Sequence, residues 1–377
     1  MDFSQTDEQK MLQESVKRLL ERSYDFETRQ KMLQSGRPWS PEIWQALAEM
    51  GILGLPFAEE VGGFGGSMAD VVAVAEPFGA HLLIEPYVSS ILLAGSCLGQ
   101  SDSPAAQAQL SKIITGEQTA AFAHEEGKGT ADPALVSLAA TEAADGFTLS
   151  GEKRMVLGGA QAEALVVSAR TRGTAPDKDG LSLFMVDPKQ QGVSITSFVT
   201  IDGRHAAHIT FDGVQIPSER RIAEDAHSVL QTVISRAIVA LCAEAVGAMG
   251  TLLRLTSEYA STRKQFGTPI ATFQTISHRL ADMKIAYVKA RSCLLYTTAL
   301  MDAGQAGAQD ISILKGQIGA LGRDIGEAAI QTHGGVGMTD EVSIGHFHKR
   351  ILTINALFGD SEYHFRAVGK SLATAKA

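Results

Sequence analysis

The sequence predicts an α+β protein with a helical N-terminal domain, a middle antiparallel β-domain and a C-terminal four-helix bundle. Apolar residues have helical spacing up to about Thr119, and then follow short alternating runs bounded by Gly, Pro and Asp. Helical spacing returns after Pro217 and lasts to the end of the chain. We therefore expect three domains, at residues 1–117, 118–222 and 223–377.

The first domain contains several helix signals. Thr6 precedes an amphipathic run that we expect to be helical to about Arg22, with the threonine as its N-cap. Pro41 suits the first turn of a second helix, which Gly51 ends. A glycine-rich loop at Val61–Gly66 comes before a third helix and lacks the Lys-Ser or Lys-Thr of a nucleotide P-loop.

The middle domain contains short runs typical of strands. Leu135–Leu138 and Phe147–Gly151 flank an Asp-Gly turn signal and predict a hairpin. Further predicted strands are Ala164–Ala169, Leu181–Val186, Val193–Phe198 and His208–Phe211. Strands at such short intervals, with no helical pattern between them, indicate a barrel or sandwich of about a hundred residues.

The C-terminal domain contains long helical patterns with short connections, which predict a helix bundle. We expect its helices at Val229–Arg263, Gln274–Met301, Asp310–Thr332 and Asp340–Phe358.

Composition limits the classes of function. The net charge of −9 argues against a nucleic-acid partner, which would require a clustered basic surface. The three cysteines lie far apart and predict neither a disulfide framework nor a metal site. No uncharged run reaches the roughly 18 residues of a membrane span, and the first residues do not resemble a signal peptide. We expect a cytoplasmic enzyme.

Three motifs in the last domain carry a resemblance. Arg263–Ile270 reads RKQFGTPI, Leu280–Met283 reads LADM, and Gln331–Gly337 reads QTHGGVG. Their order and spacing, in a chain with the α-β-α order, resemble the acyl-CoA dehydrogenase family. The likeness spans the chain and is firmest from about Arg236 onward.

The resemblance implies FAD as cofactor, bound between the β-domain and the bundle and shared with a neighbouring subunit. By matching positions, Arg263 would contact the pyrophosphate, and Phe266 and Gln274 would lie near the adenosine half. Gln331, Gly334 and Gly335 would contact the same cofactor from the partner subunit. A guanidinium and bare glycine amides suit phosphate oxygens. The alternative for Arg263 is a solvated cation at a helix end.

The implied reaction is α,β-dehydrogenation of an acyl-CoA thioester. A carboxylate takes the α-proton, hydride passes from the β-carbon to flavin N5, and electrons then go to an electron-transferring flavoprotein. The family's usual glutamate position is occupied by Phe358, and the alternative position on the central helix is Ser235. We take Asp360 as the candidate base, with a helix N-cap as its alternative role. Glu362 and Glu244 are weaker candidates, and an interior salt bridge is the expected role of Glu244.

Three further positions are assigned through the resemblance. His124 would occupy the place of a threonine that hydrogen-bonds the flavin ring, and Met155 that of a tryptophan that packs on it. Arg236 would match an arginine that contacts the CoA moiety, with an ion pair inside the bundle as its alternative. We interpret the run at His346–Arg350 as a solvated face or a subunit contact, and His364 has no partner for metal binding.

The chain is also similar to family members that form small subunits of two-subunit enzymes. A second hypothesis follows, in which the chain is a non-catalytic or half-site subunit of a heteromeric acyl-CoA dehydrogenase. A third, weaker hypothesis is a flavin oxidase on the same fold. The resemblance implies a homo- or heterotetramer.

Overall fold

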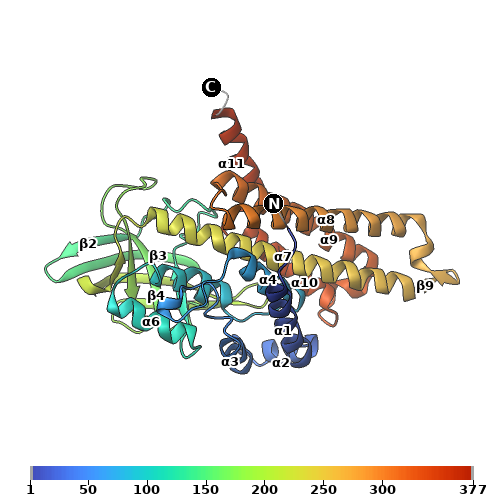
Figure 1. Ribbon diagram of the computed structural model, residues 1–377, viewed down its shortest axis with the longest axis horizontal. Coiled ribbons are helices and arrows are strands. Elements are labelled where there is room, and N and C mark those ends of the chain that lie inside the picture. Colours follow the sequence, from blue (N-terminus) through green and yellow to red (C-terminus); the bar gives the residue numbers. More distant parts are fainter. Residues whose placement is uncertain (1–2, 375–377) are drawn as a thin grey trace. The chain divides into compact units, whose positions relative to one another are not determined.

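The computed structural model describes residues 3–374 (Figure 1). The chain forms two compact units, and each is described by itself. The bundle unit comprises the residues up to Arg29, Met68–Leu83 and those from Ile238 on, and the sheet unit comprises Gln30–Ser67 and Ile84–Ala237. The predicted order of helices, strands and helices is confirmed.

The bundle unit is built around α9, against which α8, α10 and α11 each pack (Figure 1). Its helices are α1 (Asp7–Ser23), α4 (Met68–Ala80), most of α7 (His227–Thr262), α8 (Gln274–Asp302), α9 (Ala308–His333), α10 (Ser343–Ala356) and α11 (Ser361–Thr374). α1 begins as expected, because the Thr6 side chain accepts from the Gln9 amide in a capping box.

Glycines bring α4 and α7 into close contact. A Cβ on Gly79 would lie 1.7 Å from the carbonyl oxygen of Glu244, and one on Gly247 would lie 2.0 Å from that of Glu76. Ordinary carbon–oxygen contacts are about twice as long, so neither position admits a larger residue without separating the helices. Gly247 therefore serves helix packing.

The sheet unit contains an eight-stranded sheet in the order β6-β7-β3-β2-β4-β5-β8, with β1 paired to β4. The strands are β1 (Ala120–Ala123), β2 (Ala139–Ala143), β3 (Gly146–Leu157), β4 (Ala164–Arg170), β5 (Leu181–Val186), β6 (Val193–Val199), β7 (His205–Pro217) and β8 (Arg221–Ala223). The pairing is mostly antiparallel, as predicted, but β1 and β4 run parallel. One side of the sheet buries a hydrophobic core that includes Leu149, Val167, Phe184 and Phe211.

The strand predicted at Leu135–Leu138 is wrong, because the strand β2 begins only at Ala139. The amides of Ser137 and Leu138 donate to the Glu126 carboxylate, at 2.8 and 3.0 Å, and not to a neighbouring strand. A buried carboxylate thus takes the place of a strand partner for this segment.

The remaining helices precede the first strand of the sheet in the sequence. They are α2 (Phe26–Gln34), α3 (Pro41–Glu49), α5 (Ser96–Leu98), α6 (Pro104–Ile114) and the π-helix η2 (Tyr87–Gly95). The short 3₁₀ segments are η1 (Glu59–Val61), η3 (Ser218–Arg220), η4 (Ile270–Thr272) and η5 (Gly334–Met338), and β9 (Lys264–Gln265) and β10 (Thr268–Pro269) form a small hairpin.

Among the described residues, one helix, α7, is long and apolar enough to cross a membrane by length and composition. The protein buries 67% of its most apolar window, as is typical of a core helix.

Candidate functional site

Several predicted site residues gather at one end of the bundle unit. Tyr259, in the last turn of α7, stacks on His333 at the end of α9, with ring centroids 4.4 Å apart. Arg279, near the start of α8, donates to Thr332 Oγ1 at 3.4 Å. The β9–β10 hairpin follows α7 directly, so the RKQFGTPI hairpin and the QTHGGVG turn lie at the same end of the bundle.

The hairpin presents an aromatic ring at its tip. Phe266 and Gly267 both have positive φ, as a two-residue hairpin turn requires, and Phe266 is 95% exposed. Arg263, at the base of the hairpin, is exposed, and its carbonyl accepts from the Ile270 amide at 2.8 Å. Gln274 is exposed at the first position of α8. A ring this exposed offers an apolar face for contact with a ligand or another chain.

The glycine turn after α9 is open. Gly334 has φ +66° and ends the helix, and a Cβ on Gly334 or Gly335 would meet nothing within 4 Å. Gln331 is exposed on the last turn of α9, and Met338 beyond the turn is 80% exposed. The turn therefore leaves room beside its backbone for a ligand that is not part of this chain.

The second turn, between α10 and α11, is held from inside. Lys315 of α9 is fully buried, and its Nζ donates to the carbonyls of Asn355 and Gly359, both at 2.8 Å. The ring of His364 lies 2.9 Å from the Phe358 carbonyl through Nε2. Burial lowers the pKa of Lys315 to about 8. Phe358 has φ +56°, an unusual value for a bulky residue, so the turn is constrained by its contacts.

Asp360 lies at the exposed edge of this turn and caps α11. Its Oδ1 accepts from the Tyr363 amide at 2.8 Å. The alternative role, that of a helix N-cap, is therefore present in the structure. Oδ2 makes no hydrogen bond with any residue between 3 and 374, so the cap orients the carboxylate and leaves one oxygen available.

The two other candidate carboxylates are committed elsewhere. Glu244 accepts from Arg350 Nη2 at 2.6 Å and Nε at 3.1 Å, and both side chains are 4% exposed. The expected interior salt bridge is confirmed. Glu362 is 81% exposed and pairs with Arg366 one turn along α11.

The ion pair between Glu244 and Arg350 also corrects the expectation for the run at His346–Arg350. His346 and Arg350 are 8% and 3% exposed, so these two members of the run do not lie on a solvated face, whereas Lys349 is 41% exposed and pairs with Asp340. Arg29, which is also buried, lies 3.4 Å from His346 Nδ1 through Nη1. These charges belong to the interior of the bundle unit.

In the sheet unit, His124 follows β1 directly and is 8% exposed. Its Nδ1 lies 2.9 Å from Ser168 Oγ, and its ring stacks on Phe122. Burial, together with the nearby charge of Lys153, lowers the pKa of His124 to about 3, so the ring is neutral. Met155 has φ +54° at an irregularity in the β3–β7 pairing. Such bulges redirect side chains.

Arg236 and Ser235 are half-buried on the part of α7 that belongs to the sheet unit. Burial raises the pKa of the Tyr87 phenol, and the neighbouring charge of Arg236 opposes this shift. The guanidinium thus lies close to the π-helix η2, beside a buried hydroxyl.

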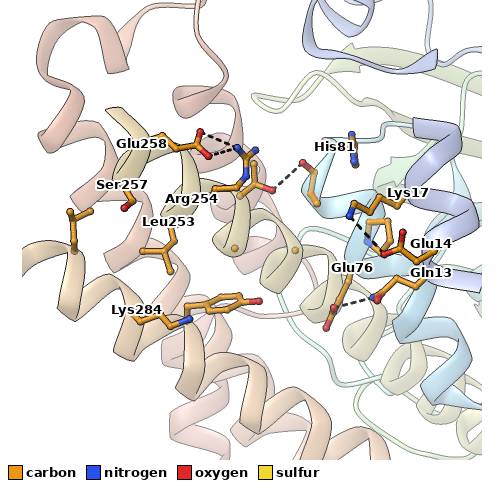
Figure 2. A pocket seen from close by; sticks show the side chains of 17 residues that line it. Gln13, Glu14, Lys17, Glu76, His81, Leu253, Arg254, Ser257, Glu258 and Lys284 are labelled. Carbon is orange, nitrogen blue, oxygen red and sulfur yellow. Dashed lines mark hydrogen bonds and ion pairs between the residues drawn. The ribbon is translucent and has the colours of Figure 1, made fainter. Parts of the chain in front are cut away.

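A cavity of about 850 Å³ lies in the bundle unit among α1, α4, α7 and α8 (Figure 2). Arg254 pairs with Glu258 at 2.9 Å and Lys17 with Glu14 at 3.8 Å, while the ammonium of Lys284 lies over the Tyr287 ring. None of the predicted site residues lines the cavity.

Lys153, Lys315 and Glu85 are among the buried ionisable groups that sequence reasoning missed. Lys153 lies an even number of residues after Phe147 and Leu149 on β3, and both of these side chains point into the core. This even spacing was the sequence signal that could have revealed the buried lysine. Lys315 similarly falls four residues after the buried Ile311 on the apolar face of α9.

Comparisons with known proteins cover nearly the whole chain. The models of the acyl-CoA dehydrogenase N-terminal, middle and C-terminal domains match residues 6–117, 120–214 and 228–373. The acyl-CoA dehydrogenase FadE27 of Mycobacterium tuberculosis is 25% identical over 100% of both chains. The caffeyl-CoA reductase–Etf complex subunit CarC of Acetobacterium woodii is 26% identical over 93% of this chain and 94% of that protein.

A solved structure of PigA with FAD and proline is also similar to the chain, with a TM-score of 0.90 and 25% identity over 99% of both chains.

Proposed function

Because the chain belongs to the acyl-CoA dehydrogenase family, we propose that it catalyses the α,β-dehydrogenation of an acyl-CoA thioester with Asp360 as the base. Members of the family are FAD-dependent oxidoreductases that act on CH–CH groups. FAD, when bound, supplies the acceptor for the hydride that leaves the β-carbon.

The residues at the end of the bundle fit this cofactor. Gly334 and Gly335 leave open space where side chains would stand, so a phosphate can approach the backbone of this turn closely. Arg263 supplies a cation at the same end of the unit, and exposed Phe266 supplies a flat apolar surface. We propose that these residues, with Gln274 and Gln331, hold the pyrophosphate and adenosine parts of FAD. In the sheet unit, His124 would meet the flavin ring.

The proposal for Asp360 rests on the geometry of its turn. Lys315 and His364 hold the turn carbonyls, and the bond from the Tyr363 amide fixes the orientation of the carboxylate. A base acts efficiently when its position is fixed before substrate binds. Free Oδ2 is then the atom that takes the α-proton. Arg236 is the proposed contact of the CoA moiety.

Asp360→Asn tests this role. Asparagine caps helices as well as aspartate does, so the fold of the turn should persist while the base is lost. We expect acyl-CoA-dependent bleaching of bound flavin, measured without oxygen, to slow by about 100-fold or more. Glu362→Gln is the matched control, because Glu362 is exposed in the next turn and should leave the rate unchanged. An unchanged rate in Asp360→Asn would remove Asp360 as the base.

A second function is favoured by Phe358, which cannot accept a proton at the family's usual glutamate position. In this proposal the chain is a half-site subunit whose open glycine turn and exposed Phe266 complete a flavin site on another chain. The isolated chain would then be colourless and would gain flavin only with its partner. Bleaching of flavin in the isolated chain by an acyl-CoA would exclude this function.

The remaining parts of the proposal concern organisation. The family matches support domain boundaries at residues 117/118 and 222/223. The similarity to a subunit of a complex with Etf supports an electron-transferring flavoprotein as the acceptor. We propose a homo- or heterotetramer in the cytoplasm, where the three free cysteines would stay reduced.

A further inference from the structure

Lys153 is fully buried inside the sheet unit, on the β3 strand. The same alternation that turns Phe147 and Leu149 into the core turns Lys153 inward. Burial lowers the pKa of Lys153 to about 8, although the charges of Glu126 and Glu125 oppose this shift. A buried cation in a strand costs free energy unless each of its protons is bonded.

Each proton of the Lys153 ammonium has an acceptor. Nζ lies 2.7 Å from Glu126 Oε1, 3.1 Å from the His124 carbonyl and 3.2 Å from Ser168 Oγ. An ammonium donates three hydrogen bonds and accepts none, so all three contacts have a defined direction. Glu126 is itself held by two backbone amides, those of Ser137 and Leu138. The lysine therefore has a fixed position against the carboxyl end of β1 and against Ser168 of β4.

The direction of the bond to Ser168 decides the state of His124. Ser168 Oγ accepts from Lys153, so its own proton remains to be donated. Within residues 3–374 the only acceptor it contacts is His124 Nδ1, at 2.9 Å. A proton on Nδ1 would leave the buried serine hydroxyl without an acceptor, which is costly. The neutral ring therefore carries its proton on Nε2.

We propose that Lys153 and Ser168 are positioning residues that fix His124 as an Nε2–H hydrogen-bond donor toward the flavin ring. This inference rests on the proposed role of His124 and adds the tautomer and the two residues that set it. Nε2 has no hydrogen-bond partner among the described residues, and the side chain keeps 8% of its surface exposed. The stack with Phe122, with rings 17° from parallel, fixes the plane in which Nε2–H points.

A donor of this kind differs from a hydroxyl in one respect. A threonine or serine hydroxyl rotates and can donate or accept, whereas the His124 Nε2–H bond has one direction and can only donate. The site would thus favour a flavin atom that carries a lone pair. Because the ring is already oriented, little conformational entropy is lost when the bond forms.

The test is 15N NMR of histidine-labelled full-length protein in the solid state, with and without added FAD. Protonated and unprotonated ring nitrogens have well-separated 15N shifts, and His124→Gln identifies the signals of His124. In the wild type at neutral pH we expect Nδ1 unprotonated and Nε2 protonated, with a preference of roughly tenfold or more. In Ser168→Ala we expect this preference to be lost, and in Ser168→Thr, which keeps the hydroxyl, to be retained.

The outcomes separate the two levels of the proposal. A proton on Nδ1, a charged ring at neutral pH, or an unchanged His124 spectrum in folded Ser168→Ala would overturn the positioning role. Lys153→Met gives a second arm, in which Ser168 loses its donor and the tautomer preference should again fall. If the expected tautomer is found but Nε2 does not shift when FAD binds, the positioning role holds and the flavin contact of His124 is refuted.

Discussion

Replacing Arg350 by methionine should destabilise the bundle unit by about 3–5 kcal/mol, the cost of leaving a buried charge without its partner. The guanidinium contacts Glu244 Oε2 through Nη2 at 2.6 Å and Nε at 3.1 Å, and each side chain is 4% exposed. Two charge-assisted hydrogen bonds of about 1.5–3 kcal/mol each give about 3–6 kcal/mol, which overlaps this range. Methionine keeps most of the apolar stem, so the loss reports the charge.

Thermal unfolding followed by circular dichroism measures this effect. For a domain of roughly 150–250 residues, 1 kcal/mol corresponds to about 2–4 °C, so Tm should fall by about 6–20 °C. Arg254→Met is the matched control, because Arg254 pairs with Glu258 on the same helix α7 but both side chains are more than half exposed. That pair should contribute less than about 1 kcal/mol.

The double variant Glu244→Gln with Arg350→Met sharpens the test. It removes both charges, so it should recover much of the loss seen in Arg350→Met alone. If Arg350→Met unfolds at the same temperature as Arg254→Met, the pair is solvated and the reasoning from burial is refuted. Recovery in the double variant would also show that Glu244 is harmful only when it is charged and unpaired, as expected for a structural carboxylate.

Two further predictions concern stability. Gly79→Ala places a Cβ 1.7 Å from the Glu244 carbonyl oxygen and should lower the free energy of unfolding, measured with urea, by about 1–3 kcal/mol. Gly369→Ala is the control, because its Cβ would meet nothing within 4 Å, and it should raise the free energy of unfolding by up to about 1 kcal/mol. Equal stabilities of the two variants would refute the close contact at Gly79. Burial raises the pKa of Glu85 to about 7. The folded state then binds this proton more tightly than the unfolded state, so its contribution is present below about pH 4.5 and is lost as pH rises through 7. Glu85→Gln should flatten this loss of about 3 kcal/mol, and identical pH profiles would contradict it.

Local signals explain which elements were predictable. The Thr6 capping box, the return of helical spacing after Pro217 and the boundaries of β5 at Leu181–Val186 follow from short-range chemistry. The strand expected at Leu135–Leu138 failed because its amides bond to Glu126, a partner that spacing alone does not reveal. The parallel pairing of β1 with β4 likewise depends on contacts between distant segments.

The residues of the candidate site likewise include some that the sequence could suggest and some that it could not. Arg263 and Gly334 could be proposed as site residues because glycine-marked motifs carry the resemblance, and the open space at Gly334 agrees with an external ligand. Lys153 and Lys315 were missed because lysine is ordinarily exposed, and its burial requires acceptors supplied by other elements. Both lysines lie on apolar faces, so a cation in phase with core residues indicates a buried hydrogen-bond network.

The two glycine-containing turns of the bundle unit differ in what surrounds their backbone. The turn at Gly334 leaves space around its backbone, whereas the turn at Phe358–Asp360 directs its carbonyls inward to Lys315 and His364. Phe358 keeps φ +56°, a conformation that is costly for a bulky residue and persists only when its surroundings impose it. Backbone strain of this kind is concentrated at functional sites. The strain therefore supports the proposed role of Asp360, whose Oδ2 makes no hydrogen bond within residues 3–374.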